Sequence, residues 1–141
     1  VWAANDQIAL GAQRAAVESG EVPGQTMTFA GLNWSDVGLA AVQDGTLTMT
    51  HGGHFFAGAW SMVMIRDLAD GRLAKDTDLT FPMSAVEPDT VDQFLELFAT
   101  RDWTTIDFEV FRRRSEDAKE GYRFTADAIL KAAQRSRLAA Q

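Results

Sequence analysis

The sequence predicts an α/β fold whose strands form a parallel sheet. Three observations support this class: an apolar run opens the chain, apolar residues then recur at helical spacing, and strand-like and helix-like segments alternate through residue 54. The opening run, Val1–Ala4, is apolar on both faces of an extended chain, which is typical of a buried strand. The polar residues that follow it, Asn5 and Asp6, lie at the sheet edge where open α/β folds bind ligands.

The first helix is predicted over Asp6–Ser19. Asn5 and Asp6 end the strand, and their side chains can accept hydrogen bonds from the free N–H groups at the start of the helix. Gly20 supplies a stop before a turn. The apolar residues at helical spacing are Ile8, Ala12, Ala15 and Ala16.

Two more strands and a short helix follow. A strand is predicted over Thr26–Leu32, which is rich in β-branched and apolar residues. Ser35 is placed to cap a helix over Asp36–Gln43, and Gly45 ends that helix. A third strand is predicted over Thr46–His51.

A pair of glycines separates the third strand from the next helix. Gly52 and Gly53 allow unusual backbone angles or the close approach of a ligand. The helix is predicted over Phe56–Leu68, and Gly71 closes it. One stripe of this helix is apolar and comprises Phe56, Ala59, Trp60, Val63, Met64 and Leu68.

The last part of the chain is less regular. Pro82 limits a strand over Asp78–Ala85 to an edge or a broken strand. A helix is predicted over Asp89–Phe98, and an irregular arm over Arg101–Arg123 because its aromatic and charged residues have no clean period. The final helix, Ala126–Ala139, is capped by Thr125.

Four pieces of the sequence carry a family resemblance. They are Ala4–Ala12, Val22–Gly24, Phe29–Asn33 and Val42–Thr48. In this order and at nearly this spacing they resemble a signature of the type I periplasmic binding proteins, the ribose-binding class. The match is strong over about the first half of the chain and loose beyond it.

This resemblance implies a parallel-sheet lobe of a two-lobed fold, with a hinge crossover and a C-terminal helical tail. Residues 1–54 are then the α/β core of the C-terminal lobe. Residues 55–77 form a crossover helix that normally packs on the N-terminal lobe, and residues 78–141 contain the returning strand and the tail. Because Val1 begins inside a strand, without an initiating Met or a signal peptide, we expect the N-terminal lobe to be absent from this chain.

Composition limits the class of partner. The 141 residues are enough for one domain with a core. A net charge of −7 and a pI near 4.7 argue against a nucleic-acid partner, which needs a basic surface. The lack of cysteine leaves the compartment open, and no apolar run approaches the roughly 20 residues of a membrane helix. The resemblance implies a periplasmic location.

Five residues are candidates for ligand binding: Asn5, Asp6, Asn33, Trp34 and His54. The amide and carboxylate of Asn5 and Asp6 can bind sugar hydroxyls, although they can equally serve only as helix caps. The resembled family usually has an Asp at the position of Asn33, so the neutral amide is a departure that changes the expected hydroxyl pattern or charge. Trp34 can stack on a sugar ring or serve as a hydrophobic residue beside the turn.

The two histidines occur together as His51-Gly52-Gly53-His54. A metal site needs more ligands than these two, and neither a cysteine nor a zinc-type helical spacing is present. The resembled family has a polar ligand-contacting residue near Gly53, and an alignment slip of one residue leaves Gly53 or His54 in that place. Of the two, only His54 has a side chain able to bind.

No motif indicates catalysis. The sequence contains no Gly-x-Ser-x-Gly elbow, no phosphate-binding glycine loop and no cysteine, so neither an enzyme nor a cofactor is expected. The run Arg112-Arg113-Arg114 suggests an anion site, but acidic residues surround it in the sequence. We therefore interpret it as a solvated charge cluster.

Two functions are consistent with the sequence. The first is a solute-binding component that captures a small polar ligand, a sugar or a sugar-like molecule, between two lobes for an ABC-type transporter and its membrane permease. The alternative is a receptor of the same fold that signals to a membrane histidine kinase. With the second lobe missing, weak ligand binding is expected, and so is self-association through Phe56, Trp60 and Val63.

Overall fold

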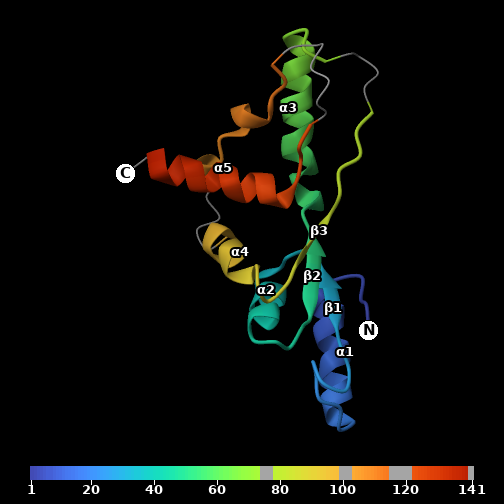
Figure 1. The fold of residues 1–141 in the computed structure, drawn as a ribbon. Helices are drawn as coiled ribbons and strands as arrows, with labels where there is room; N and C mark the ends of the chain where they lie inside the picture. The colour runs from blue at the N-terminus through green and yellow to red at the C-terminus, as the bar shows by residue number, and fades with distance from the viewer. Residues whose placement is uncertain (74–77, 99–102, 115–121, 140–141) are drawn as a thin grey trace. The chain divides into compact units, whose positions relative to one another are not determined.

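The computed structural model describes residues 1–73, 78–98, 103–114 and 122–139 (Figure 1). The chain forms two compact units. Unit 1 consists of Val1–His54 and Met83–Arg101, and unit 2 of Phe55–Pro82 and Asp102–Gln141. The chain therefore leaves unit 1 after His54, re-enters it at Met83 and leaves it again after Arg101. None of the described helices combines the length and the apolar character needed to cross a membrane.

Unit 1 is built around a small mixed sheet. Its strands are β1 (Ala30–Leu32), β2 (Met49–Gly52) and β3 (Ser84–Val86), in the order β1-β2-β3. β1 and β2 are parallel, as predicted, and β3 is antiparallel to β2. The opening segment adds a single parallel bridge, in which Trp2 pairs with Ala30. The carboxyl ends of these first three segments therefore meet at one edge of the sheet.

The strands are shorter than the sequence predicts. The predicted strand Val1–Ala4 is reduced to the Trp2 bridge and is not buried on both faces, because the Trp2 side chain is 67% exposed. The strand predicted over Thr26–Leu32 begins only at Ala30, since Met27 instead pairs with Pro23 across a turn. β3 begins after Pro82, whose ring cannot donate a ladder hydrogen bond.

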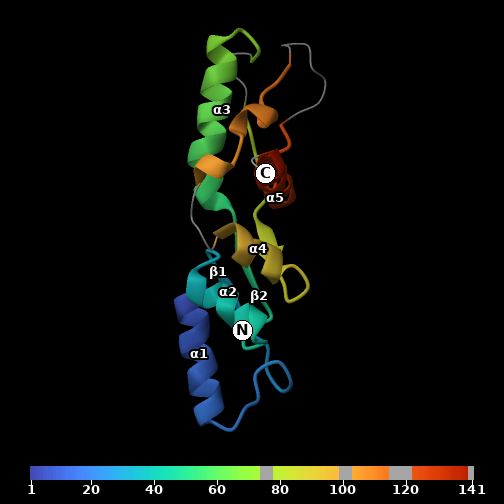
Figure 2. The same cartoon turned by 90° about the vertical axis from the view of Figure 1, so that its left-hand side faces the viewer.

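Three of the helices that the structure describes belong to unit 1: α1 (Asp6–Glu18), α2 (Asp36–Gln43) and α4 (Val91–Phe98). α1 packs on β1, and α2 lies beside α4 (Figure 1 and Figure 2). The predicted caps of the first two helices are confirmed: Asn5 Oδ1 accepts from the Ile8 N–H at 2.8 Å, and Ser35 Oγ accepts from the Gly38 N–H at 3.1 Å. The fully buried core residues include Phe29, Leu39, Val42, Leu47 and Val86.

Unit 2 is organised around α3 (Ala57–Ala69), which follows the 3₁₀ turn η1 (His54–Phe56). The other elements of unit 2 are η2 (Trp103–Thr105), η3 (Phe108–Phe111) and α5 (Ala126–Ala139). The Trp60 ring stacks on Phe124 with centroids 4.4 Å apart, and it meets Phe111 edge-on at 5.0 Å. Aromatic stacking and edge contacts of this kind add to the stability gained from burial alone.

The part of the apolar stripe of α3 around Trp60 is thus covered by the chain's own rings, whereas Leu68, at the end of the stripe, is 42% exposed. Phe56, Trp60 and Val63 are all buried, and Phe56 meets Trp103 edge-on at 5.5 Å. The predicted self-association through Phe56, Trp60 and Val63 is therefore wrong, because these side chains are not left at the surface. The sequence alone could not show that aromatic residues near the C-terminus pack against this helix.

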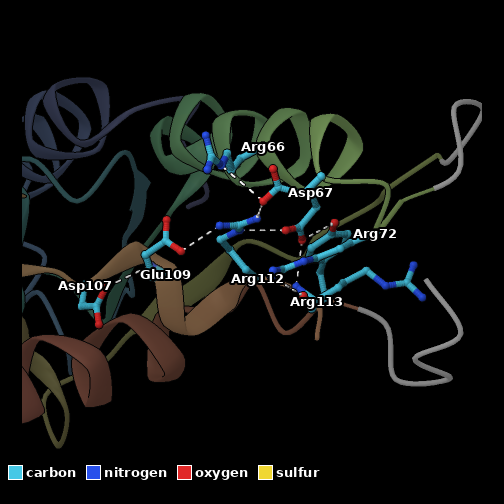
Figure 3. Close-up of polar contacts among 9 residues, drawn as sticks. Arg66, Asp67, Arg72, Asp107, Glu109, Arg112 and Arg113 are labelled. Atoms are coloured by element: carbon cyan, nitrogen blue, oxygen red, sulfur yellow. Dashed lines mark hydrogen bonds and ion pairs between the residues drawn. The ribbon is translucent and has the colours of Figure 1, made fainter. Parts of the chain in front are cut away.

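An ion-pair network centred on the buried carboxylate of Asp67 fastens η3 to α3 (Figure 3). Arg112 Nε donates to Asp67 Oδ1 at 2.9 Å, and its guanidinium also pairs with Asp70 and Glu109. Asp67 Oδ2 accepts from the Arg113 N–H at 2.8 Å and from the Tyr122 hydroxyl at 3.0 Å. The interpretation of Arg112 as part of a solvated charge cluster is therefore wrong, since its side chain is only 9% exposed.

The network shifts the titration of its members. Burial alone raises the pKa of Asp67, but hydrogen bonds from the Arg113 backbone, Arg112 and Tyr122 outweigh it, so the pKa lies below its usual value. The hydrogen bond from Arg112 is the main cause that lowers the pKa of Asp70. In turn, hydrogen bonds to Asp67, Asp70 and Glu109 raise the pKa of Arg112.

The remaining predictions are met to different degrees. α3 and α5 form close to their predicted bounds, and Thr125 Oγ1 accepts from the Ala128 N–H at 3.2 Å as a cap. The predicted irregular arm, Arg101–Arg123, contains η2 and η3, while its residues 101–102 and 115–121 lie outside the described part of the chain. The domain roles assigned to residues 1–54, 55–77 and 78–141 stay predictions.

Candidate functional site

The predicted ligand residues of unit 1 follow the carboxyl ends of neighbouring parallel segments. Asn5 and Asp6 come after the Trp2 bridge, Asn33 and Trp34 come after β1, and His54 comes shortly after β2. Because the three segments are parallel, these positions share one edge of the sheet. We call this set of residues the polar edge. A cleft at the polar edge stays a prediction.

Asp6 is the fully buried member of the polar edge. Its Oδ2 accepts from the Ser35 N–H at 2.9 Å and from the Ser35 hydroxyl at 2.7 Å. Its Oδ1 accepts from the Thr50 hydroxyl at 2.6 Å. The carboxylate therefore links the start of α1 to the start of α2 and to β2, and these hydrogen bonds offset the cost of burying it.

Two glycines make room for this carboxylate. A Cβ atom at Gly31 or at Gly38 would lie 2.2 Å from an Asp6 carboxylate oxygen, which no side chain tolerates without displacement. Gly31 is the middle residue of β1 and Gly38 lies in α2. The absence of a side chain at both positions lets the first helix, the strand and the second helix converge on Asp6.

Asn5 is half-buried and fills the role of helix cap that the sequence also predicted for it. Its Oδ1 is used by the Ile8 N–H, so the amide nitrogen is the part of the side chain that remains for a ligand. Direct ligand contact by Asn5 stays a prediction.

Asn33 and Trp34 have an unusual backbone. Their φ angles are +114° and +54°, in the left-handed region that residues with a side chain rarely adopt. The Asn33 N–H donates to the His51 carbonyl at 2.6 Å, which fixes the chain where β1 ends. Residues with strained backbone angles cluster at functional sites, so the turn that follows β1 is a candidate for such a site.

The Trp34 ring lies inside unit 1 and is only 5% exposed. Its Nε1–H is shared between the Thr50 carbonyl at 3.1 Å and the Ser84 carbonyl at 3.2 Å. The ring also meets Phe94 edge-on with centroids 4.8 Å apart. Of the two predicted roles, this burial favours the hydrophobic residue beside the turn, and stacking on a sugar stays a prediction.

The histidines take different positions. His54 is exposed at the start of η1, the last residue of unit 1 before the chain leaves it. His51 lies on β2, and its ring is 5.4 Å from that of Trp2. Sequence reasoning considered His51 only as a metal ligand. Among the residues that the structure describes, no group of three or more His, Cys, Asp or Glu side chains is placed to hold a metal ion.

A separate pocket occurs in unit 2. It has a volume of about 210 Å³ and lies between α3 and η3, with Met62, Val63 and Phe108 among its apolar lining residues. The charged residues that line it are Arg66, Glu109 and Arg112. Arg112 is already held by three carboxylates, so this pocket offers little unused binding chemistry.

Comparison with solved structures relates this arrangement to known folds. A periplasmic sugar-binding protein from Pseudomonas fluorescens matches 92% of the chain with 35% sequence identity and a TM-score of 0.70. This is the fold of a lobe of the type I periplasmic binding proteins. The resemblance inferred from the sequence and the predicted fold class are therefore confirmed.

Two further binding-protein structures match less of the chain. An ABC transporter solute-binding protein from Bacillus halodurans C-125 with bound myo-inositol covers 67% of the chain, with 26% identity and a TM-score of 0.51. A galactofuranose-binding protein covers 71%, with 25% identity and a TM-score of 0.53. All three neighbours are binding proteins rather than enzymes. No protein-family model and no curated protein matches the chain.

The chain spans less than half of each neighbour. It covers 40% of the Pseudomonas protein, 32% of the Bacillus protein and 34% of the galactofuranose-binding protein. The likeness therefore concerns one part of a periplasmic binding protein.

Proposed function

We propose that the chain forms one wall of the sugar-binding site of a periplasmic solute-binding protein that serves an ABC-type transporter and its permease. The observation that carries this proposal is the polar edge, where Asn5, Asn33 and His54 follow parallel segments at the end of the sheet that binds ligands in open α/β folds. The neighbours support it, because they bind a sugar, myo-inositol and galactofuranose. No feature of the described residues favours the alternative, a receptor for a histidine kinase.

The chemistry of the polar edge suits a neutral ligand with several hydroxyl groups. Asn5 and Asn33 supply amides and His54 an imidazole, groups that donate to and accept from hydroxyls. The carboxylate of the set, Asp6, is fully buried and occupied by Ser35 and Thr50. We therefore assign direct ligand contact to Asn5, Asn33 and His54, and a supporting role to the buried Asp6 and Trp34.

Nuclear magnetic resonance titration of the 141-residue chain tests the proposal, because it detects the weak binding expected of a single wall. Myo-inositol and a galactofuranoside serve as neutral probes, and a sugar phosphate of similar size serves as the charged control. The neutral probes are expected to shift the resonances of Asn5, Asn33 and His54 at millimolar concentration. The proposal is wrong if these resonances stay unmoved while others respond, or if none responds.

Variants separate ligand contact from helix capping. Asn5→Ser keeps an oxygen that caps α1 but removes the amide nitrogen, so it is expected to weaken binding without lowering thermal stability. Gln7→Ala, at an exposed neighbouring position, is the matched control and is expected to leave binding unchanged. Unchanged binding by Asn5→Ser would assign Asn5 to the cap alone.

A further inference from the structure

Trp34 touches two of the three places where the chain passes between the two units. We call these two places the two connections. The first passage follows His54, and the second ends at Met83. A Cβ atom at Gly52 would lie 2.5 Å from the Trp34 ring, and one at Gly53 would lie 3.2 Å from it, so the ring rests on the backbone just before the first passage. Its Nε1–H donates to the Ser84 carbonyl, one residue beyond Met83. One side chain therefore contacts both connections.

The backbone conformation of Trp34 holds its ring in this position. Its φ of +54° and the +114° of Asn33 before it are unfavourable for residues with side chains, and such angles persist only where surrounding contacts enforce them. The enforcing contacts of Trp34 are its N–H to Thr50 Oγ1 at 3.3 Å and its indole N–H to two carbonyls. The same Thr50 hydroxyl donates to Asp6, so Thr50 connects Trp34 to the buried carboxylate of Asp6.

The glycine pair makes this placement possible. Gly52 lies in β2 opposite Ser84 of β3, so the ring lies where the two strands are paired. Gly53 has a φ of +100°, a conformation that turns the chain out of β2 toward His54 at low cost only for glycine. The ring, the glycine pair and the start of β3 therefore form one packed group at the two connections.

We propose that Trp34 is a positioning residue that holds the chain at these two connections in one arrangement and ties that arrangement to Asn33. The link to ligand binding rests on the proposed function, because it assigns the neighbouring Asn33 to the ligand. The contacts of Trp34 with both connections do not depend on any ligand. Removing or displacing the indole is therefore expected to increase local opening at both connections.

Hydrogen–deuterium exchange on the ligand-free chain tests this. Trp34→Phe keeps an aromatic ring but removes the N–H donated to Thr50 and Ser84. Gly52→Ala keeps the indole but displaces it. Each variant is expected to speed exchange about fivefold or more in peptides that contain residues 51–56 and in those that contain residues 82–86, since a buried hydrogen-bonded contact is lost in both.

Two control variants show whether the effect is local. Gly11→Ala adds a methyl group to α1 where no atom lies within 4 Å, so it is expected to leave the two connections unchanged. Phe94→Leu removes the edge contact with Trp34 but keeps the indole N–H and both of its carbonyl acceptors. It is expected to lower the melting temperature without selective exchange at the connections.

The outcomes decide the proposal independently of sugar binding. Faster exchange at both connections in Trp34→Phe and Gly52→Ala supports it, even if no sugar binds. Faster exchange at only one connection, or an equal increase throughout unit 1, overturns it, even if a sugar does bind. If Trp34→Phe does not fold, Gly52→Ala alone decides by the same criteria.

Discussion

The carboxylate of Asp6 accepts the hydroxyl hydrogen of Thr50 at 2.6 Å, although 44 residues separate the two in the sequence. The other carboxylate oxygen holds Ser35, so one buried side chain joins the first helix, the second helix and the central strand. The polar edge therefore depends on one of its own members, the buried carboxylate of Asp6.

Removing this carboxylate is expected to destabilise unit 1. Asp6→Ala leaves three donors without their acceptor, and we expect it to lower the free energy of unfolding by about 2–4 kcal/mol. Thr50→Val removes one donor and is expected to cost about 1 kcal/mol. Urea denaturation measures both, and a loss of less than about 0.5 kcal/mol for Asp6→Ala would contradict the assigned role.

Glycine-to-alanine substitutions in two helices are expected to change stability in opposite directions. Gly38→Ala places a methyl group against Asp6 and should destabilise the protein by about 1–3 kcal/mol through overpacking. Gly11→Ala meets nothing within 4 Å and should stabilise it by about 0.5–1 kcal/mol through helix propensity. Thermal unfolding of the two variants checks this, and the same sign in both would be inconsistent with the packing around Asp6.

Local sequence signals predicted a large part of this architecture. The bounds of α2 and its Ser35 cap follow from residues within one turn, so they were predictable. The lengths of the strands were overestimated, because residue composition alone shows neither the pairing of Met27 with Pro23 nor the exposure of Trp2. For the same reason the burial of Asp6 and Arg112 was missed: their partners Thr50 and Asp67 lie about 45 residues away.

Asp67 is expected to matter far more than an exposed acidic residue. Asp67→Ala removes the acceptor of three hydrogen bonds and should lower the free energy of unfolding by about 2–4 kcal/mol. Asp127→Ala breaks the exposed i,i+4 pair with Lys131 and should cost no more than about 0.5 kcal/mol. Denaturant unfolding compares the two, and similar losses would show that the α3–η3 network contributes no more than a surface pair.

Tyr122 is expected to lose its proton at a higher pH than an ordinary tyrosine does. Burial, together with the hydrogen bond to Asp67 and its charge, raises the pKa of Tyr122 to about 12. The unfolded phenol titrates near pH 10, so the stability that the neutral phenol contributes is complete below about pH 10 and is lost as the pH rises through about 12. Because Tyr122 is the single tyrosine in the chain, ultraviolet absorbance follows it directly.

Tyr122→Phe is the control for this titration. It removes the absorbance change and should abolish the part of the alkaline stability loss that the phenol causes. A tyrosinate midpoint near pH 10 in the folded protein would show that the hydroxyl is not held by Asp67.

The Trp60 ring stacks on Phe124, far along the chain, and this separation has a consequence during synthesis. A ribosome adds about 5–20 residues per second, so α3 emerges several seconds before the rings that cover it. Throughout that interval Phe56, Trp60 and Val63 face water on the nascent polypeptide, although they are buried in the finished protein. The nascent chain is therefore most prone to aggregation and to chaperone binding before Phe124 leaves the exit tunnel.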